Sequence, residues 1–201
     1  MTTGPLDLDL ERWEPWTPTE AAARLEGVSA RWYVLGGWAL DLFLDRQTRE
    51  HADLEIGVRE EDFDEIQAAL TGLELFVIGD GRAWPLNEQS AQEHRQRWVR
   101  EPGGPWRVDV IRERWDADEW VYRRDDRVRC PSSGAIAETS DGIPFLQPEL
   151  VLLFKAKDTR PKDTADFALT LPALEHDRRR WLHRALSIAH PGHRWLDELR
   201  A

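Results

Sequence analysis

Two acidic residues, Asp53 and Glu55, stand two positions apart in segment 51–58, whose residue pattern predicts a strand. Successive strand residues point to opposite faces, so both carboxylates would project from one face about 7 Å apart, while Leu54 and Ile56 face a core. Two neighbouring carboxylates repel each other unless a positive charge lies between them. The pair therefore indicates a site for a divalent cation such as Mg²⁺, which prefers oxygen ligands.

A third acid, Asp109, lies between Val108 and Val110 in a second predicted strand. A neighbouring strand, about 4.8 Å away, could bring Asp109 to the same face as the first two acids. Three such acids could hold two Mg²⁺ ions about 4 Å apart, an arrangement that stabilises both oxygens exchanged in a nucleotidyl transfer. An Asp-x-Glu pair on a strand face is more often a solvated surface than a metal site, so the argument depends on its joint occurrence with the other motifs.

The pair Gly36-Gly37 lies upstream of these acids, between a predicted strand over 32–35 and a predicted helix over 38–44. A strand that turns through glycines into a helix directs free backbone N–H groups and the positive end of the helix dipole at one point. This order of elements predicts a cradle for phosphate groups.

Basic residues near the acidic strand are candidates for the outer phosphates of a nucleotide. Arg46 and Arg49 precede the strand, and arginine binds phosphate oxygens in pairs. The alternative is a solvated loop in which the two arginines pair with Asp45 and Glu50.

Lys155 and Lys157 lie two residues apart on a predicted helix, so only one can point at a nucleotide, and the apolar pattern favours Lys155. Asp163 and Asp166 share a helical face further on. They could complement a cationic substrate, but a structural role is favoured for them.

The chain has 201 residues, with 27 Lys and Arg against 38 Asp and Glu, a net charge of −11. This charge argues against nucleic acid as a partner and favours small neutral or cationic molecules. The acids Glu74, Asp80 and Glu88 could bind amines. A single cysteine, Cys130, and the lack of a membrane-spanning or signal segment predict a cytoplasmic protein. Oligomeric state is left open.

The elements that must position these residues form an α+β pattern. Thr17 and Glu20 form a capping box for a helix that runs to Glu26, before Gly27. Further helices are predicted over 60–70, 148–157, 162–171 and 176–190, and further strands over 73–78, 97–100, 106–111, 120–123, 127–130 and 135–138. The pattern predicts a mixed β-sheet flanked by helices over 1–146, followed by a helical C-terminal segment over 147–201.

Three short segments together resemble the signature of the nucleotidyltransferase superfamily: Leu35-Gly36-Gly37, Asp53-Leu54-Glu55-Ile56 and Val108-Asp109-Val110. A longer match over 36–41, 46–53 and 155–166 resembles the aminoglycoside 2''-adenylyltransferase-like family. The likeness spans about residues 32 to 170.

The resemblance implies the nucleotidyltransferase fold and transfer of a nucleoside monophosphate, AMP, to a hydroxyl of a small cationic molecule such as an aminoglycoside. The donor would be ATP or another nucleoside triphosphate, with Mg²⁺. By motif position Asp53 and Glu55 would bind metal, and Gly36 and Gly37 would face the triphosphate. Asp109 would be the third ligand or the base that takes the acceptor proton.

Two other functions stay open. Trp38 follows the glycine pair, where many superfamily members have serine, and the second metal acid is Glu55 rather than aspartate. These two residues are compatible with a non-catalytic, nucleotide-binding descendant. A toxin-type nucleotidyltransferase that modifies RNA or protein is the other alternative, and it is disfavoured by the net negative charge. A purely structural module leaves the three acids and the glycine pair unexplained.

Overall fold

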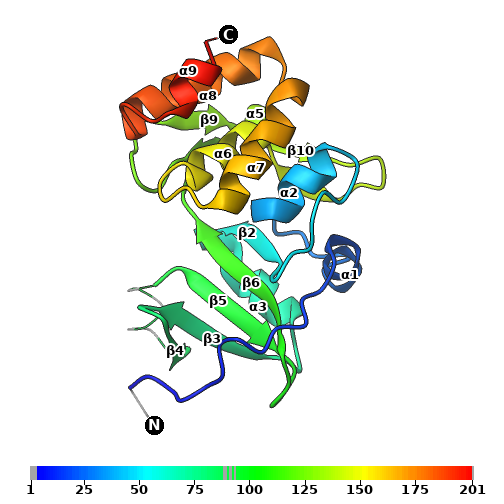
Figure 1. Ribbon diagram of the computed structural model, residues 1–201. Helices are drawn as coiled ribbons and strands as arrows, with labels where there is room; N and C mark the ends of the chain where they lie inside the picture. The colour runs from blue at the N-terminus through cyan, green and yellow to red at the C-terminus, as the bar shows by residue number, and fades with distance from the viewer. Residues whose placement is uncertain (1–3, 88–89, 91, 93, 201) are drawn as a thin grey trace. The chain divides into compact units, whose positions relative to one another are not determined.

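The computed structural model describes residues 4–87, 90, 92 and 94–200 (Figure 1). The chain forms two compact units. Unit 1 comprises Met1–Val34 and Glu50–Glu113, and unit 2 comprises Leu35–Arg49 and Arg114–Ala201. The predicted boundary between residues 146 and 147 does not coincide with this division, because the helix that follows Leu35 packs with C-terminal helices.

Unit 1 contains six strands of a mixed sheet in the order β1-β2-β6-β5-β3-β4. Their bounds are β1 Trp32–Val34, β2 Glu55–Arg59, β3 Glu74–Gly79, β4 Arg82–Pro85, β5 Gln96–Arg100 and β6 Trp106–Glu113. β2 and β6 are parallel, and the other pairs are antiparallel. Sequence analysis did not predict β4, since its four residues immediately follow a tight turn.

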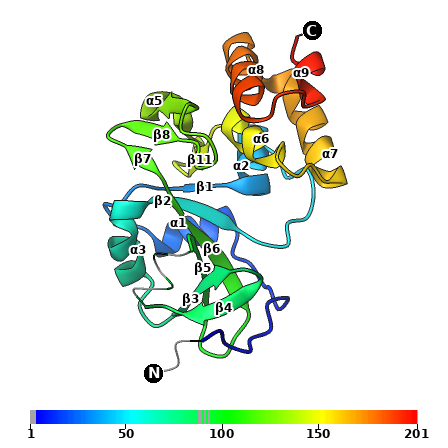
Figure 2. The ribbon, with the colours of Figure 1, turned by 90° about the vertical axis from the view of Figure 1, so that its left-hand side faces the viewer.

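Two helices accompany this sheet. The predicted capping box begins α1 (Pro18–Arg24): Glu20 N donates to Thr17 Oγ1 at 3.2 Å, and Thr17 N donates to the Glu20 carboxylate at 2.8 Å. The helix ends two residues before Glu26. α3 (Phe63–Ala69) follows a 3₁₀ turn, Glu60–Asp62, and packs against β2 through a buried face (Figure 2).

An N-terminal arm, residues 4–16, crosses unit 1 and is held by backbone bridges and indole contacts. Trp13 forms a parallel bridge with Trp106 and lies edge-on to Trp98, with ring centroids 4.7 Å apart. Trp106 Nε1 donates to the carbonyl of Asp9 at 2.8 Å. The aromatic rings therefore anchor the arm.

Unit 2 is built from helices and short strands. Its helices are α2 Gly36–Phe43, α5 Ser132–Ala135, α6 Pro148–Lys155, α7 Pro161–Thr170, α8 His176–Ala189 and α9 Trp195–Glu198, with a 3₁₀ turn at Leu171–Ala173. Its strands are β7 Trp115–Asp116, β8 Glu119–Val121, β9 Arg129–Pro131, β10 Ile136–Glu138 and β11 Pro144–Leu146. The last four helices appear in yellow to red in Figure 1. Among the described residues, every helix is too short or too polar to cross a membrane.

The glycine pair is part of α2 rather than a loop before it. Gly36 is the first helical residue and has φ +61°, a left-handed conformation that glycine adopts without steric cost. Leu35, at the N-cap, provides no side-chain hydrogen bond. The helix thus begins two residues earlier than predicted, and its first N–H groups receive no side-chain cap.

Candidate active site

Asp109 and Glu55 lie side by side on neighbouring strands of unit 1. β2 and β6 run parallel with Glu55 opposite Asp109, and Asp109 N donates to the carbonyl of Leu54 at 2.8 Å. Residues in register point to the same face of a sheet. The predicted placement of Asp109 beside the acidic strand is therefore confirmed.

Asp53 lies just before β2 rather than on it. The strand begins at Glu55, so the predicted strand over 51–58 is shorter at its start. Asp53 is exposed, whereas Glu55 is partly buried. The difference has a simple reason: β6 pairs with β2 only from Glu55 onward, and Asp53 precedes that ladder.

Asp109 is buried, with 3% of its surface exposed. Burial raises the pKa of Asp109 well above its ordinary value, and the negative charges of Glu55 and Asp53 raise it further. Gln96 and Trp98 oppose this pKa shift by favouring the ionised carboxylate. The charges of the two other predicted acids thus act on Asp109.

The two oxygens of Asp109 have different surroundings. Oδ2 accepts a hydrogen bond from Gln96 Nε2 at 2.6 Å. Oδ1 is buried and accepts no hydrogen bond of ordinary geometry within the described part of the chain. The buried indole Nε1 of Trp98 also completes none of that geometry there, although Trp98 still favours the ionised carboxylate. Trp98 pairs with Asp109 in the β5–β6 register. An unsatisfied carboxylate oxygen in a buried position is costly, and a cation or a donor from a ligand would satisfy it.

The described residues contain no group of three or more His, Cys, Asp or Glu side chains arranged to hold a metal ion. The acids of unit 1 interact through their charges without being gathered around one point.

The candidate phosphate-binding residues of unit 2 have different environments. Arg46 is exposed after Asp45, which has φ +53°. Arg49 forms two hydrogen bonds with Asp166, at 3.0 and 3.1 Å, instead of pairing only with its sequence neighbours. Lys155 is 9% exposed and contacts two carboxylates.

Asp163 and Asp166 form ion pairs with these basic side chains. Lys155 Nζ lies 3.0 Å from Asp163 Oδ1 and 2.9 Å from Asp166 Oδ2. Burial alone would raise the pKa of both acids, but hydrogen bonds from Arg160 and Lys155 at Asp163, and from Arg49 and Lys155 at Asp166, hold both pKa values below the ordinary range. The structural role favoured for these aspartates is observed, with partners other than Lys162.

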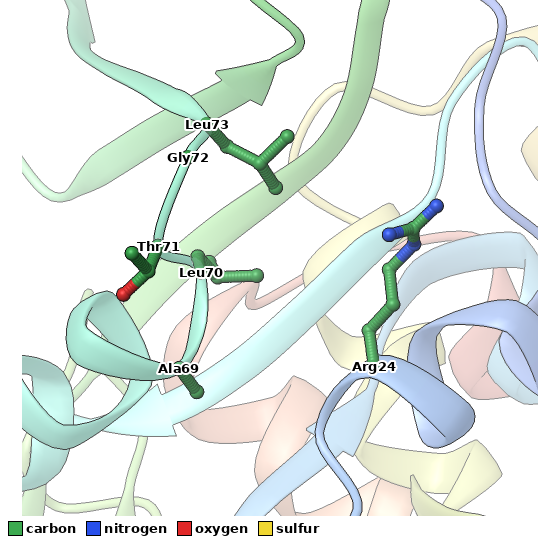
Figure 3. A pocket seen from close by; sticks show the side chains of 6 residues that line it. All are labelled: Arg24, Ala69, Leu70, Thr71, Gly72 and Leu73. Carbon is green, nitrogen blue, oxygen red and sulfur yellow. The ribbon is translucent and has the colours of Figure 1, made fainter.

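The other predicted amine-binding acids do not join Asp109. Glu74 accepts a hydrogen bond from Arg100 at 2.8 Å, and Asp80 is exposed in a turn. Glu88 lies outside the described residues. A hollow of about 310 Å³ in unit 1 is lined by Arg24 of α1 and by residues 69–73 of the turn after α3 (Figure 3). It includes none of the predicted site residues.

Gln96 is the contact that sequence analysis missed. It lies at the end of a polar segment, 85–96, that has no clear periodicity. Its position two residues before Trp98 on β5 was the available signal, because alternate residues share a face and Trp98 pairs with Asp109.

Comparison with solved structures identifies the fold. A solution structure of the antibiotic-resistance factor ANT(2'')-Ia covers 85% of this chain and 89% of its own, with 16% identity and a TM-score of 0.57. A crystal structure of ANT(2'')-Ia with adenylyl-2''-tobramycin covers 86% and 94%, with 15% identity and a TM-score of 0.56. The lincosamide antibiotic adenylyltransferase LnuA, lincomycin-bound, covers 81% and 99%, with 15% identity and a TM-score of 0.57. The fold is therefore that of the nucleotidyltransferases.

The sequence itself points to one group among them. The model of the aminoglycoside-2''-adenylyltransferase family matches residues 19–113, which include all three acids and the glycine pair. No curated protein matches the chain. The predicted resemblance is confirmed: the chain has the fold of the nucleotidyltransferases, and its residues 19–113 are similar to the aminoglycoside-2''-adenylyltransferase family. Enzymes of that family in general use a nucleoside triphosphate as co-substrate and a divalent metal ion.

Proposed function

We propose that the protein transfers AMP from ATP to a hydroxyl of a small cationic acceptor of the aminoglycoside type, with Mg²⁺. The observation that carries this proposal is the buried Asp109, beside Glu55 on one sheet face, inside the segment that matches the family model. The acidic character of the chain suits a cationic acceptor.

The residues fit a divalent cation at one specific atom. Asp109 Oδ1 is a buried oxygen without a hydrogen-bond partner among the described residues, and the charges of Glu55 and Asp53 act on it. We assign Asp53, Glu55 and Asp109 as the residues that would hold Mg²⁺. When bound, the ion would neutralise charge on the transferred phosphoryl group and its leaving group.

The protein's own residues would carry out the other parts of the reaction. Asp109 would also take the proton of the acceptor hydroxyl, because a carboxylate held close to the reacting hydroxyl can act as a general base. Within unit 2, Gly36 and Gly37 begin α2, whose first N–H groups have no side-chain cap and would suit a phosphate group.

The test is direct. The protein is incubated with labelled ATP or GTP, Mg²⁺ and a panel of aminoglycosides and lincosamides, and pyrophosphate release and the acceptor mass are followed. We expect a mass gain of one nucleoside monophosphate, and loss of turnover in Asp53→Asn and Asp109→Asn. Asp64→Asn, at an exposed position on α3, is the control and should keep full activity.

Two results would contradict the proposal. Turnover at the wild-type rate in either acid variant would refute the assignment of these acids as metal ligands. Binding of ATP and Mg²⁺ without turnover on any acceptor would instead support the nucleotide-binding descendant, for which Trp38 and Glu55 are the sequence features.

A further inference from the structure

The carboxylate of Asp109 is held asymmetrically by strand β5. Gln96 Nε2 donates to Oδ2 at 2.6 Å, a short distance for a hydrogen bond to a carboxylate. Oδ1 is buried and accepts no hydrogen bond of ordinary geometry among the described residues. Gln96 therefore provides the one well-formed side-chain hydrogen bond to this carboxylate in the described part of the chain.

The position of Gln96 follows from the sheet. Gln96 and Trp98 are two residues apart on β5, and Trp98 is the register partner of Asp109. Side chains at this spacing share a face, so Gln96 reaches Asp109 diagonally across the strand pair. Trp98 is packed edge-on against Trp13 of the N-terminal arm, which limits movement on the other side of the carboxylate.

We infer that Gln96 is a positioning residue for Asp109: by donating to Oδ2 it fixes the orientation of the carboxylate that would bind the cation. This inference rests on the proposed function, because it assumes that Asp109 serves the reaction. Without the amide, the carboxylate could rotate about its side-chain bonds and turn either oxygen away. Groups that hydrogen-bond a metal-ligating carboxylate orient it, and their loss typically reduces metal affinity or activity about 10- to 100-fold.

The central variant is Gln96→Leu, which removes the donor while keeping a side chain of similar size. We expect Mn²⁺ binding, measured by calorimetry without nucleotide, to weaken about 10- to 100-fold. In turnover assays kcat should fall by a similar factor, with the acceptor KM within about twofold, since Gln96 contacts Asp109 and not the acceptor.

The matched control is Arg100→Leu. Arg100 is on the same strand and also donates to a carboxylate, that of Glu74 at 2.8 Å, away from the three acids. A general effect of altering β5 would appear in both variants. Mn²⁺ affinity and kcat that change equally in both, or that stay within about twofold of wild type in Gln96→Leu, would overturn the inference.

A third measurement separates this inference from the proposed function. The side-chain amide protons of Gln96 can be followed by NMR in wild type and in Asp109→Ala, without metal or substrate. A large shift on losing the carboxylate is expected, and its absence would show that Gln96 does not hold Asp109. If the shift is present but wild type binds no Mn²⁺ and turns over no acceptor, the proposed function fails and the positioning role fails with it.

Discussion

Replacing Lys155 with methionine tests the buried ion pairs of unit 2. Its ammonium group lies 3.0 Å from Asp163 and 2.9 Å from Asp166, and the three side chains are only 9%, 1% and 4% exposed. Methionine keeps the volume of the apolar stem but removes the charge. Losing one partner of a buried pair costs about 3–5 kcal/mol, because it leaves uncompensated charge. Arg49 and Arg160 still contact the aspartates, so we expect the lower end, about 3 kcal/mol.

Lys157→Met is the matched control. Lys157 is 51% exposed and lies 3.4 Å from Asp158, which is 83% exposed. A surface pair of this kind contributes about 0–1 kcal/mol. Urea unfolding followed by circular dichroism at pH 7 would measure both variants, and the Lys155→Met loss corresponds to a Tm lower by about 6–12 °C. A free energy of unfolding for Lys155→Met within about 1 kcal/mol of the control would refute the reasoning.

The same pairs predict a pH dependence. The folded-state pKa values of Asp163 and Asp166 are lowered, so their contribution to stability is complete above the unfolded pKa, about 3.9, and is lost as pH falls through the lower folded values. The stability difference between wild type and Lys155→Met should therefore be constant from pH 7 to about pH 5 and shrink below about pH 4. A difference that grows on acidification would contradict this assignment.

Two pairs of glycine substitutions test the backbone around the acids and at α2. A Cβ at Gly57 would lie 2.5 Å from the buried ring of Tyr33, so Gly57→Ala should cost about 1–3 kcal/mol in urea unfolding, while Gly4→Ala, with no atom within 4 Å, should be neutral. Gly36→Ala should cost about 1–2 kcal/mol because Gly36 has φ +61°, whereas Gly37→Ala should not destabilise α2. Equal effects within either pair would contradict these expectations.

The sheet around the acids was predictable because its strands alternate strongly. Val108, Asp109 and Val110 show the two-residue period of a strand with one buried polar position, and the pairing of β6 with β2 follows it. The register between strands was not predictable in the same way. A hydrophobic pattern shows which face of the sheet a residue lies on, but not which residue of the next strand lies opposite. The contact of Gln96 with Asp109 could therefore be recognised only once the β5–β6 pairing was known.

The partners of Arg49 could not be read from local sequence. Asp45 and Glu50 are its charged neighbours in the chain, yet it forms two hydrogen bonds with Asp166, 117 residues away. Burial explains this choice, because an aspartate that is 4% exposed gains more from a guanidinium than an exposed acid does. Long-range pairs of this kind depend on the packing of helices, which charge spacing does not report.

The two groups of acids have opposite electrostatic environments. At Asp163 and Asp166 the protein supplies cations from its own side chains, and the pKa of each acid is lowered. At Asp109 the charges that act on it, from Glu55 and Asp53, are negative, and its pKa is raised. Burying a carboxylate beside like charges opposes folding unless some other group offsets it. A bound cation would offset the uncompensated negative charge at Asp109, whereas the aspartates of unit 2 already have cationic partners. This difference supports assigning the metal to Asp109 rather than to the aspartates of unit 2.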